Sequence, residues 1–458
     1  MTATPAQSSI KFKLFLMMIL EIAIWGAWQP KIFSYMGMLG FVDWQQFLVG
    51  SVFGIASILG IFFSNQFADR HFAAEKFLAA SHVIGGVALV GAAFATDFWP
   101  FFLLFCLYGI VYVPTISVTN SLAFANLKEP ARDFGFVRMG GTIGWIVVSW
   151  PFIFLVGEKA GAEQVKSIFL VAAVLSFIMA GYSLTLPHTP PRKGAEGLDK
   201  LAWLKAVKLL GTPFVLVLFI VTLIDSVIHN GYFVVSDAFL TNRVGIAGNL
   251  SMVVMSIGQV AEILTMLVLG AVLIRCGWRT TMILGILGHA ARFAVFAFCP
   301  NMMGLIIVVQ ILHGICYAFF FATVYIFVDA VFPKDIRSSA QGLFNLLILG
   351  VGMVVASYVF PKLQWQFVSE PVLQNLLSQP AVQTVMSGDP KFAALQGGEL
   401  LAKISQVDSL KEVVTKAWAV SNWQQLFLVP TGMALVGIVL LAFFFRPPTR
   451  GPVGEVKH

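Results

Sequence analysis

The chain has 458 residues, of which 58% are hydrophobic and only 11% charged, and its mean hydropathy is +0.87. A soluble core of this length cannot use so much apolar surface, so the composition predicts a protein embedded in lipid. The formal net charge of +7 does not indicate nucleic-acid binding, because no basic cluster stands apart from the apolar segments. The cysteines show no CxxC spacing, which is typical of free thiols.

Apolar segments long enough to cross about 30 Å of hydrocarbon recur along the whole chain. The first continues through WGAW without a small-residue cleavage site, so we expect a membrane span and not a cleaved signal peptide. The sequence therefore predicts an all-α membrane protein with about twelve spans. The predicted spans are 12–36, 46–66, 77–95, 100–125, 136–156, 167–186, 213–240, 248–274, 280–299, 303–331, 338–360 and 424–445.

Lysine and arginine are unevenly distributed between the connecting segments. With the N-terminus inside, nineteen of the 29 fall in inner segments, whereas the short outer loops hold only Lys31, Lys159, Lys166 and Arg243. The positive-inside rule then places both termini in the cytoplasm of a bacterial inner-membrane protein.

Six predicted spans precede residue 190 and six follow it. We expect an N-terminal half at 1–190, a cytoplasmic linker with an amphipathic surface helix at 191–212, and a C-terminal half at 213–458. An extracytoplasmic insertion at 362–422 is expected to form short surface helices. This layout is typical of the major facilitator fold, in which two halves rock around a site near the bilayer midplane.

Ionisable groups inside the spans are the best functional signal, because a charge at the bilayer centre costs at least ~2.5–3.5 kcal/mol on insertion scales. Glu262, Gln259 and Ser256 are spaced by three and share one helix face. We expect this face to line a cavity, with a substrate or proton role for Glu262. The alternative is a structural Glu262 satisfied by Arg292 of a neighbouring helix.

Asp225 and His229 are four residues apart, so they can pair on one helix face. Such a pair is a candidate proton relay, because histidine titrates near neutral pH. It can equally serve only to hold a helix break at Gly231. Asn230 lies beside the pair, and Asp237 follows in the same span.

Two spans combine polar groups with indoles at helical spacing. Such a set can donate hydrogen bonds to a polar solute and stack on a planar ring, although core tryptophans give the same pattern. The sets are Arg138, Thr142 and Trp145 in the fifth span, and Glu21, Trp25 and Trp28 in the first.

His313 and Tyr317 share a face of the tenth span, while His82, His289 and Tyr112 occur singly, as packing residues usually do. HExxH, GxxxxGK[ST] and GxSxG sequences are absent, so we expect no enzyme, no ATP coupling, no metal and no cofactor. The sequence favours secondary transport driven by a proton or sodium gradient.

Nine segments together resemble the nucleoside:proton symporter family of the major facilitator superfamily, the bacterial nucleoside permeases. They occur in both predicted halves and in the family's order. They are WGAWQPKIFSYM (25–36), ADRHFAAEKFLAASHVIGG (68–86), YVPTISVTN (112–120), VRMGGTIGW (137–145), LTLPHTPPRK (184–193), MSIGQVAEIL (255–264), ARFAVFAF (291–298), HGICYAFFF (313–321) and IRSSAQGLF (336–344).

The resemblance implies that Arg138, Thr142 and Trp145 help to hold a nucleoside, with Trp145 stacking on the base. It implies hydrogen bonding by Gln259 and a proton-coupling role for Glu262. It also implies that residues of the seventh and tenth helices, Asn230, His313 and Tyr317, lie in the site.

One position departs from the family pattern. Where the family reads GxCYDFF, this chain reads GICYAFF, so Ala318 replaces an intramembrane aspartate. Asp225 or Glu21 could substitute for that carboxylate.

The sequence therefore predicts a monomeric secondary transporter that imports nucleosides by proton symport. The alternatives are a transporter of another small polar solute, such as a sugar, a glycoside or a cell-wall fragment, and a non-transporting sensor or scaffold.

Overall fold

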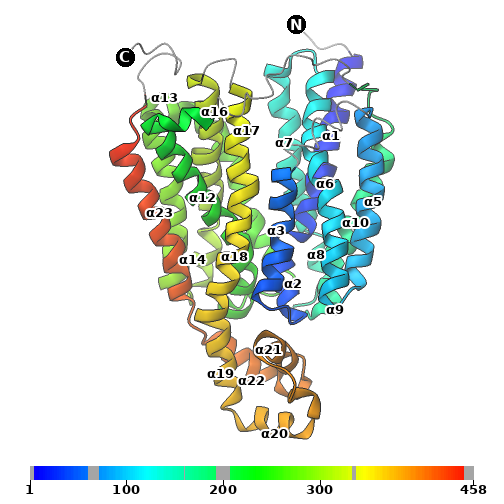
Figure 1. Cartoon of the computed structure of the whole chain (residues 1–458), viewed down its shortest axis with the longest axis vertical. Helices are drawn as coiled ribbons and strands as arrows, with labels where there is room; N and C mark the ends of the chain where they lie inside the picture. The colour runs from blue at the N-terminus through cyan, green and yellow to red at the C-terminus, as the bar shows by residue number, and fades with distance from the viewer. Residues whose placement is uncertain (1–4, 60–71, 159, 192–206, 333–336, 448–458) are drawn as a thin grey trace. The chain divides into compact units, whose positions relative to one another are not determined.

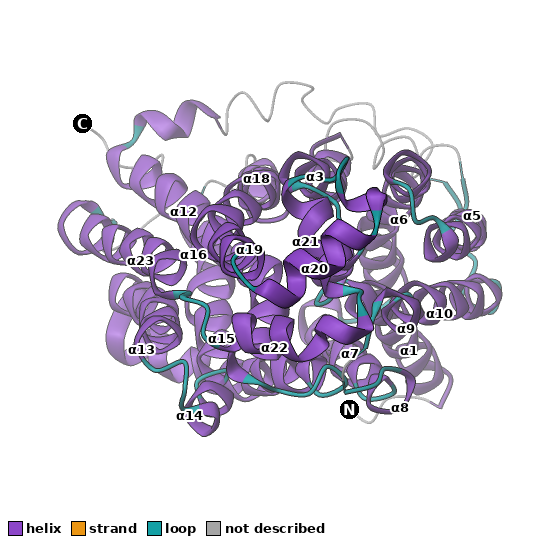
Figure 2. Ribbon diagram, turned by 90° about the horizontal axis from the view of Figure 1, so that it is seen from below, coloured by secondary structure: helices purple, strands orange, loops and turns teal. Residues whose placement is uncertain are grey.

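The computed structural model describes residues 5–59, 72–158, 160–191, 207–332 and 337–447. Within these ranges the chain is helical throughout and contains no strand, as Figure 2 shows. The predicted linker helix falls mostly in 192–206, outside the described residues.

The described helices account for twelve spans. Nine described helices are long and apolar enough to cross a membrane. One of them is Ser251–Phe298, which has 48 residues. That helix contains a non-helical glycine, Gly277 at φ 72°, and so holds two spans on either side of it. The two remaining spans are α1 (Pro5–Trp28) and α3 (Asp43–Leu59), the second of which ends where the described residues stop. The predicted fold class is confirmed.

The described chain divides into two compact units, which do not coincide with the predicted halves. Unit 1 comprises residues 1–193, 233–256 and 357–422, and unit 2 the remainder. The division into two six-helix halves therefore stays a prediction.

Unit 1 is built around the first six spans. Its first predicted span ends early, because Pro30 interrupts the helix after Trp28 and a short helix follows. The further helices of these spans are α2 (Ile32–Met38), α5 (Ala74–Phe94), α6 (Phe98–Asn126), α7 (Pro130–Ser149), α8 (Phe152–Leu155), α9 (Ala162–Val165) and α10 (Ser167–Ser183).

Glycines allow α1 and α7 to approach closely. A Cβ at Gly144 would lie 2.1 Å from the main-chain oxygen of Ile19, and one at Gly140 would lie 2.6 Å from that of Phe15. Small residues at helix contacts are the usual way in which membrane helices pack tightly. Helix α10 packs against both α1 and α5, and α5 packs against α6, as can be followed in Figure 1.

Unit 2 contains most of the last six spans. Several are interrupted by π-helical turns, which often mark functional sites. Its elements are α12 (Pro213–Ala238), α13 (Ser251–Phe298), α14 (Met303–Val308), α15 (Ile311–Cys316), η4 (Tyr317–Ala322), α16 (Thr323–Val331), α17 (Arg337–Asn345), η5 (Leu346–Val351), α18 (Gly352–Gln364) and α23 (Gln424–Phe444), of which α12, α13 and α18 extend into unit 1.

The insertion between the last two spans forms short helices, as predicted, and has its own apolar core. The core includes Leu376, Val382, Ile404 and Leu410, all at most 1% exposed. The insertion lies at the end of unit 1 that carries α2 and α9, and the amide of Gln406 donates to the main-chain oxygen of Met38 (Figure 1). Its helices are η6 (Trp365–Ser369), α19 (Glu370–Leu377), α20 (Pro380–Gly388), η7 (Pro390–Phe392), α21 (Gly397–Ser405), η8 (Asp408–Leu410) and α22 (Lys411–Ala419).

A buried ion pair lies in unit 1 near the same end. The Lys31 ammonium is 2.8 Å from Oδ1 of Asp237, and both side chains are only 3% exposed. The Ser251 hydroxyl donates to the same oxygen at 2.5 Å. Asp237, noted in the sequence only as one more acid of its span, is thus paired with a lysine of the loop after α1.

Candidate functional site

In unit 1, the first and fifth spans bring together the predicted aromatic set. The rings of Trp25 and Trp145 meet edge to face at 5.8 Å, and Trp145 also contacts Phe233 at 5.6 Å. A Cβ at Gly26 would lie 3.1 Å from Trp145 Cα, so a glycine makes room for this indole. Trp25, Thr142 and Trp145 are partly exposed. They keep surface that a solute can touch.

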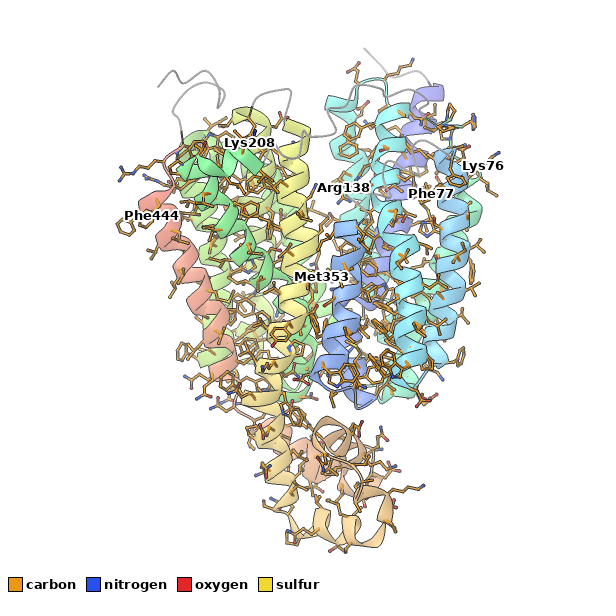
Figure 3. The ribbon with its side chains drawn as sticks, in the orientation of Figure 1. Lys76, Phe77, Arg138, Lys208, Met353 and Phe444 are labelled. Atoms are coloured by element: carbon orange, nitrogen blue, oxygen red, sulfur yellow. The ribbon has the colours of Figure 1, made fainter. Side chains whose placement is uncertain are left out.

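Arg138 lies on α7, one turn before Thr142, and its side chain is exposed (Figure 3). A guanidinium with accessible donors can bind a polar solute. Arg138 and Thr142 therefore remain candidates for substrate binding.

Trp28 does not fit the predicted role. Its indole is 2% exposed and packs edge to face against Phe53 and Phe105. Its Nε1–H donates to the Tyr108 hydroxyl at 3.0 Å. With no free face and its donor already used, Trp28 is a packing residue in this structure.

Glu21 is fully buried on α1 and lies in a polar network. Its Oε2 is 3.0 Å from Nε2 of His82 on α5, and its Oε1 accepts a 2.6 Å hydrogen bond from Thr115 on α6. The Tyr112 hydroxyl donates to the Glu21 main-chain oxygen at 2.5 Å. His82 Nδ1 lies 3.2 Å from Ser176 Oγ on α10. Such a buried carboxylate can meet a proton, whereas a nucleoside cannot reach it.

Unit 2 holds a second buried network around Asp225 on α12, and its partner corrects the sequence prediction. Nε2 of His289, on α13, lies 3.6 Å from Oδ1 of Asp225, and both side chains are 0% exposed. Within the described chain, neither carboxylate oxygen of Asp225 has a hydrogen-bond partner. The predicted Asp225–His229 hydrogen bond is therefore absent, because Asp225 points toward another helix.

Arg292 fixes the histidines of this network. Its guanidinium donates to Nδ1 of His313 at 2.7 Å and to Nδ1 of His289 at 3.2 Å, and it stacks 4.1 Å from the ring centre of Tyr232. Because both Nδ1 atoms accept, both imidazoles carry their hydrogen on Nε2. The Arg292 guanidinium contacts these two histidines and Tyr232, and the alternative in which a neighbouring helix satisfies Glu262 stays a prediction.

His313 was predicted to line the substrate site, but it is only 1% exposed and is enclosed by this network. Its ring stacks on that of His229 at 4.7 Å and lies 4.8 Å from that of Tyr232. Tyr232 in turn donates to Gln310 at 2.8 Å. In this structure His313 positions Arg292 and His229 instead of offering a free surface.

The remaining predicted residues of unit 2 lie near a tight helix crossing. A Cβ at Gly314 would be 2.1 Å from the backbone nitrogen of Glu262, so α13 and α15 touch there. Glu262 and Tyr317 are partly exposed, whereas Gln259 is 6% exposed. In the described chain the Gln259 Oε1 atom has no hydrogen-bond partner, which leaves an acceptor for a ligand.

Asn230, at 9% exposure, uses its amide nitrogen within unit 2. It donates to the main-chain oxygen of Ser226 at 2.9 Å and approaches that of Ile348 at 3.4 Å. The Ser226 hydroxyl bonds to the same segment of η5. Asn230 therefore joins α12 to η5.

Sequence reasoning treated His82 and His289 as isolated and did not single out Thr115 or Ser176. A signal for the histidines was available: one acid, followed four and seven residues later by ring-bearing side chains, occurs in both the first and the seventh span. The two sets are Glu21, Trp25 and Trp28, and Asp225, His229 and Tyr232. His82 and His289 lie in the third and ninth predicted spans, which are the third spans of the two predicted halves.

The described residues contain no group of three or more His, Cys, Asp or Glu side chains that could hold a metal ion. In the described spans, Glu21 is hydrogen-bonded to His82 and Thr115. Arg292 is hydrogen-bonded to two histidines, while Asp225 lies at ion-pair distance from His289. A bundle of apolar helices with ionisable groups buried inside the spans is typical of multi-pass membrane transporters.

The chain belongs to the nucleoside H+ symporter family, whose sequence model matches residues 8–387. It is 32% identical over 354 residues to YegT of Escherichia coli K12, whose name places it among nucleoside transporters, covering 75% of this chain and 82% of that protein. It is 28% identical over 366 residues to the xanthosine permease of the same organism, covering 76% of this chain and 86% of that protein.

Solved structures agree with this fold. The crystal structure of the nucleoside transporter NupG superposes with a TM-score of 0.75 and 23% identity, covering 96% of this chain and all of that one. A bacterial homologue of the lysosomal transporter Spinster, in an inward-facing unoccupied conformation, gives a TM-score of 0.72 at 14% identity, covering 98% of this chain and all of that one. Its membership of the nucleoside H+ symporter family makes the chain a multi-pass inner-membrane transporter and not an enzyme.

Proposed function

We propose that this protein imports nucleosides together with protons by alternating access. Membership of the nucleoside H+ symporter family over residues 8–387 carries the proposal. Relatives that match three quarters of the chain include a nucleoside permease and a xanthosine permease. The protein would act as a monomer in the lipid bilayer with both termini in the cytoplasm.

The exposure of the predicted residues supports a division of roles. Arg138, Thr142, Trp145 and Trp25 keep accessible surface in unit 1, and they offer donors together with aromatic faces. This combination suits a nucleoside, whose base stacks and whose sugar accepts and donates hydrogen bonds.

In unit 2, Glu262 and Tyr317 are partly exposed, and Gln259 offers an unused acceptor. Glu262 stays a candidate both for substrate binding and for proton coupling. Asp225 and His229 also stay proton-coupling candidates, although the fixed cation Arg292 lies beside them.

Ala318 bears directly on the identity of the substrate. It is 0% exposed, so the family carriers' carboxylate is missing from a buried point of η4. The alternative substrate is a different polar solute, such as a sugar. The counterflow assay described next separates a nucleoside transporter from a sugar transporter.

The test is counterflow in proteoliposomes loaded with uridine or adenosine. Wild-type protein should exchange nucleosides, and Trp145→Ala should weaken the apparent affinity for purines and pyrimidines alike by about tenfold, because stacking one base contributes about 1–3 kcal/mol. Trp150→Ala is the matched control, since Trp150 ends the same helix and is 55% exposed.

Unchanged affinity in Trp145→Ala would remove Trp145 from the site. Exchange of sugars but of no nucleoside by the wild type would overturn the substrate assignment. Exchange of no solute by folded protein would favour the non-transporting alternative.

A further inference from the structure

The Glu21–His82 pair is a titratable pair enclosed by neutral partners. Glu21 is 0% exposed and His82 is 1% exposed. Among the described residues, His82 is the single partner of Glu21 at ion-pair distance. No lysine or arginine of the described chain neutralises this carboxylate directly, so its charge depends on what the histidine carries.

The hydrogen-bond geometry leaves one atom of this pair free to change state. Glu21 Oε1 accepts from Thr115, so Oε2 is the oxygen that faces His82 Nε2 at 3.0 Å. An ionised Glu21 carboxylate only accepts, and opposite it Nε2 carries a hydrogen. The remaining ring nitrogen, Nδ1, faces the Ser176 hydroxyl at 3.2 Å.

The Ser176 hydroxyl has two acceptors within reach, Nδ1 of His82 and the main-chain oxygen of His82 at 2.9 Å. When His82 is neutral, the hydroxyl donates to Nδ1. When His82 binds a proton at Nδ1, that N–H donates to Ser176 Oγ, and the hydroxyl turns to the main-chain oxygen. The network gains one proton and loses no hydrogen bond.

Each helix packed around Glu21 contributes defined groups. Helix α5 supplies His82, α6 supplies Tyr108 and Tyr112, and α7 supplies Arg138, whose charge reaches the Tyr112 hydroxyl along with that of Glu21. Helix α10 supplies the uncharged Ser176, while its Tyr182 is turned toward the main chain of Lys13. His82 is thus the group of this network that offers a ring nitrogen, Nδ1, placed to take a proton.

We infer that Glu21, His82 and Ser176 form a proton-binding site within unit 1, in which His82 Nδ1 takes the proton, Glu21 balances the resulting charge and Ser176 adapts to both states. The assignment of this proton to transport rests on the proposed symport function. The site is separate from the partly exposed residues proposed to bind the nucleoside.

Proton binding changes the net charge of the buried network from −1 to zero. A buried unbalanced charge is costly in a membrane-embedded helix bundle, so the two states favour different surroundings. A conformation that lets water reach Glu21 would favour the empty state, and a dry one would favour the loaded state. That difference is what a coupled proton requires.

The first test needs no substrate: nitrogen NMR of the full-length protein in lipid, with 15N-histidine, between pH 5 and pH 9. The His82 signals are assigned by their loss in His82→Gln. We expect Nε2 to stay protonated throughout and Nδ1 to gain its hydrogen as the pH falls. A His82 that keeps one tautomer over the whole range would overturn the proposal.

Ser176→Ala tests the adapting hydroxyl. A hydrogen bond from a charged imidazolium is roughly twice as strong as one to a neutral ring, so its loss weakens proton binding and moves the midpoint to lower pH by about half a unit to one unit. Ser183→Ala is the matched control, because Ser183 is a buried serine of the same helix whose hydroxyl donates to the main-chain oxygen of Met179. An unmoved midpoint in Ser176→Ala would contradict the role of Ser176.

Glu21→Gln connects the site to transport. Proton-driven accumulation should be lost while nucleoside counterflow persists. The pH midpoint of His82 protonation should also fall by more than about one pH unit, because the glutamine no longer balances the imidazolium charge. Glu75→Gln is the control, since Glu75 is also paired with a histidine, the exposed His188, and should keep accumulation. Accumulation by Glu21→Gln at the wild-type level would overturn the coupling role.

The two hypotheses can fail separately. A His82 that titrates in a protein that exchanges no nucleoside would leave the proton site intact and remove the proposed substrate. Nucleoside exchange by a protein in which His82 keeps one tautomer would keep the proposed substrate and remove the proton site.

Discussion

The Glu21 network and the Asp225 network share one arrangement of acid and histidine and differ in the group on the other side of the histidine ring. Each places an acid on the first span of a predicted half and a histidine on the third, with the histidine Nε2 toward the carboxylate at 3.0 Å and 3.6 Å respectively. In unit 1 the histidine Nδ1 meets a serine hydroxyl, whereas in unit 2 it meets the guanidinium of Arg292.

That single difference decides what each network can do. A hydroxyl accepts or donates, so His82 can be neutral or charged. A guanidinium only donates and stays charged, so His289 must remain neutral while Arg292 contacts it. The same arrangement of acid and histidine therefore serves a site that can change charge in unit 1 and one with a fixed cation in unit 2.

The largest expected effect comes from removing the fixed cation. Arg292→Met should lower the free energy of unfolding by about 3–5 kcal/mol at pH 8, because it removes the cation near Asp225 and leaves the buried Nδ1 atoms of His289 and His313 without a donor. The loss should be smaller at pH 5, where Asp225 can escape by binding a proton. Denaturation by SDS titration in mixed micelles measures both values.

Two further variants sharpen the interpretation of Arg292→Met. Arg279→Met changes an exposed arginine of the same helix and should have little effect. Adding Asp225→Asn to Arg292→Met should restore part of the stability. Equal destabilisation by the single and double variants would mean that Arg292 acts through its hydrogen bonds to the two histidines and its packing on Tyr232, and not through its charge near Asp225.

The sequence predicted the spans well because apolar length alone decides whether a segment crosses the bilayer. Spacing also identified which residues share one face of their own helix, as for Glu21 and Trp25. Spacing cannot tell which neighbouring helix that face meets. Asp225 was therefore paired with His229 of its own helix, and its contact with His289 was missed.

Burial explains the other sequence errors at the candidate site. Trp28 and His313 have the residue types of a substrate site, yet both are at most 2% exposed. Their partners, Tyr108 and Arg292, come from other helices. Whether an indole or imidazole meets a solute or a packed neighbour depends on tertiary packing, which a single sequence does not encode locally.

A second prediction compares the two histidines directly. His82→Gln should abolish the dependence of nucleoside accumulation on the pH gradient, which for one coupled proton is about tenfold per pH unit. His289→Gln should keep that dependence, because Arg292 still supplies the positive charge beside Asp225. Nucleoside accumulation in proteoliposomes at imposed pH gradients measures the dependence for each variant. If His289→Gln also loses it, both networks are needed for proton coupling.

The smallest expected effect concerns two buried rings, Trp28 and Tyr232. They follow Glu21 and Asp225 by seven residues in their helices. Trp28 donates to Tyr108 in unit 1, and Tyr232 donates to Gln310 in unit 2. Tyr232→Phe should cost about 1–2 kcal/mol of unfolding free energy, since it leaves the buried Gln310 oxygen without its donor while the ring still stacks on Arg292. Tyr358→Phe is the control, because Tyr358 is 52% exposed and its hydroxyl can bond to water or headgroups. A cost well above this range would indicate that the Tyr232 hydroxyl also orients Arg292, and the fixed charge of unit 2 would then depend on a hydrogen bond as the charge of unit 1 depends on Ser176.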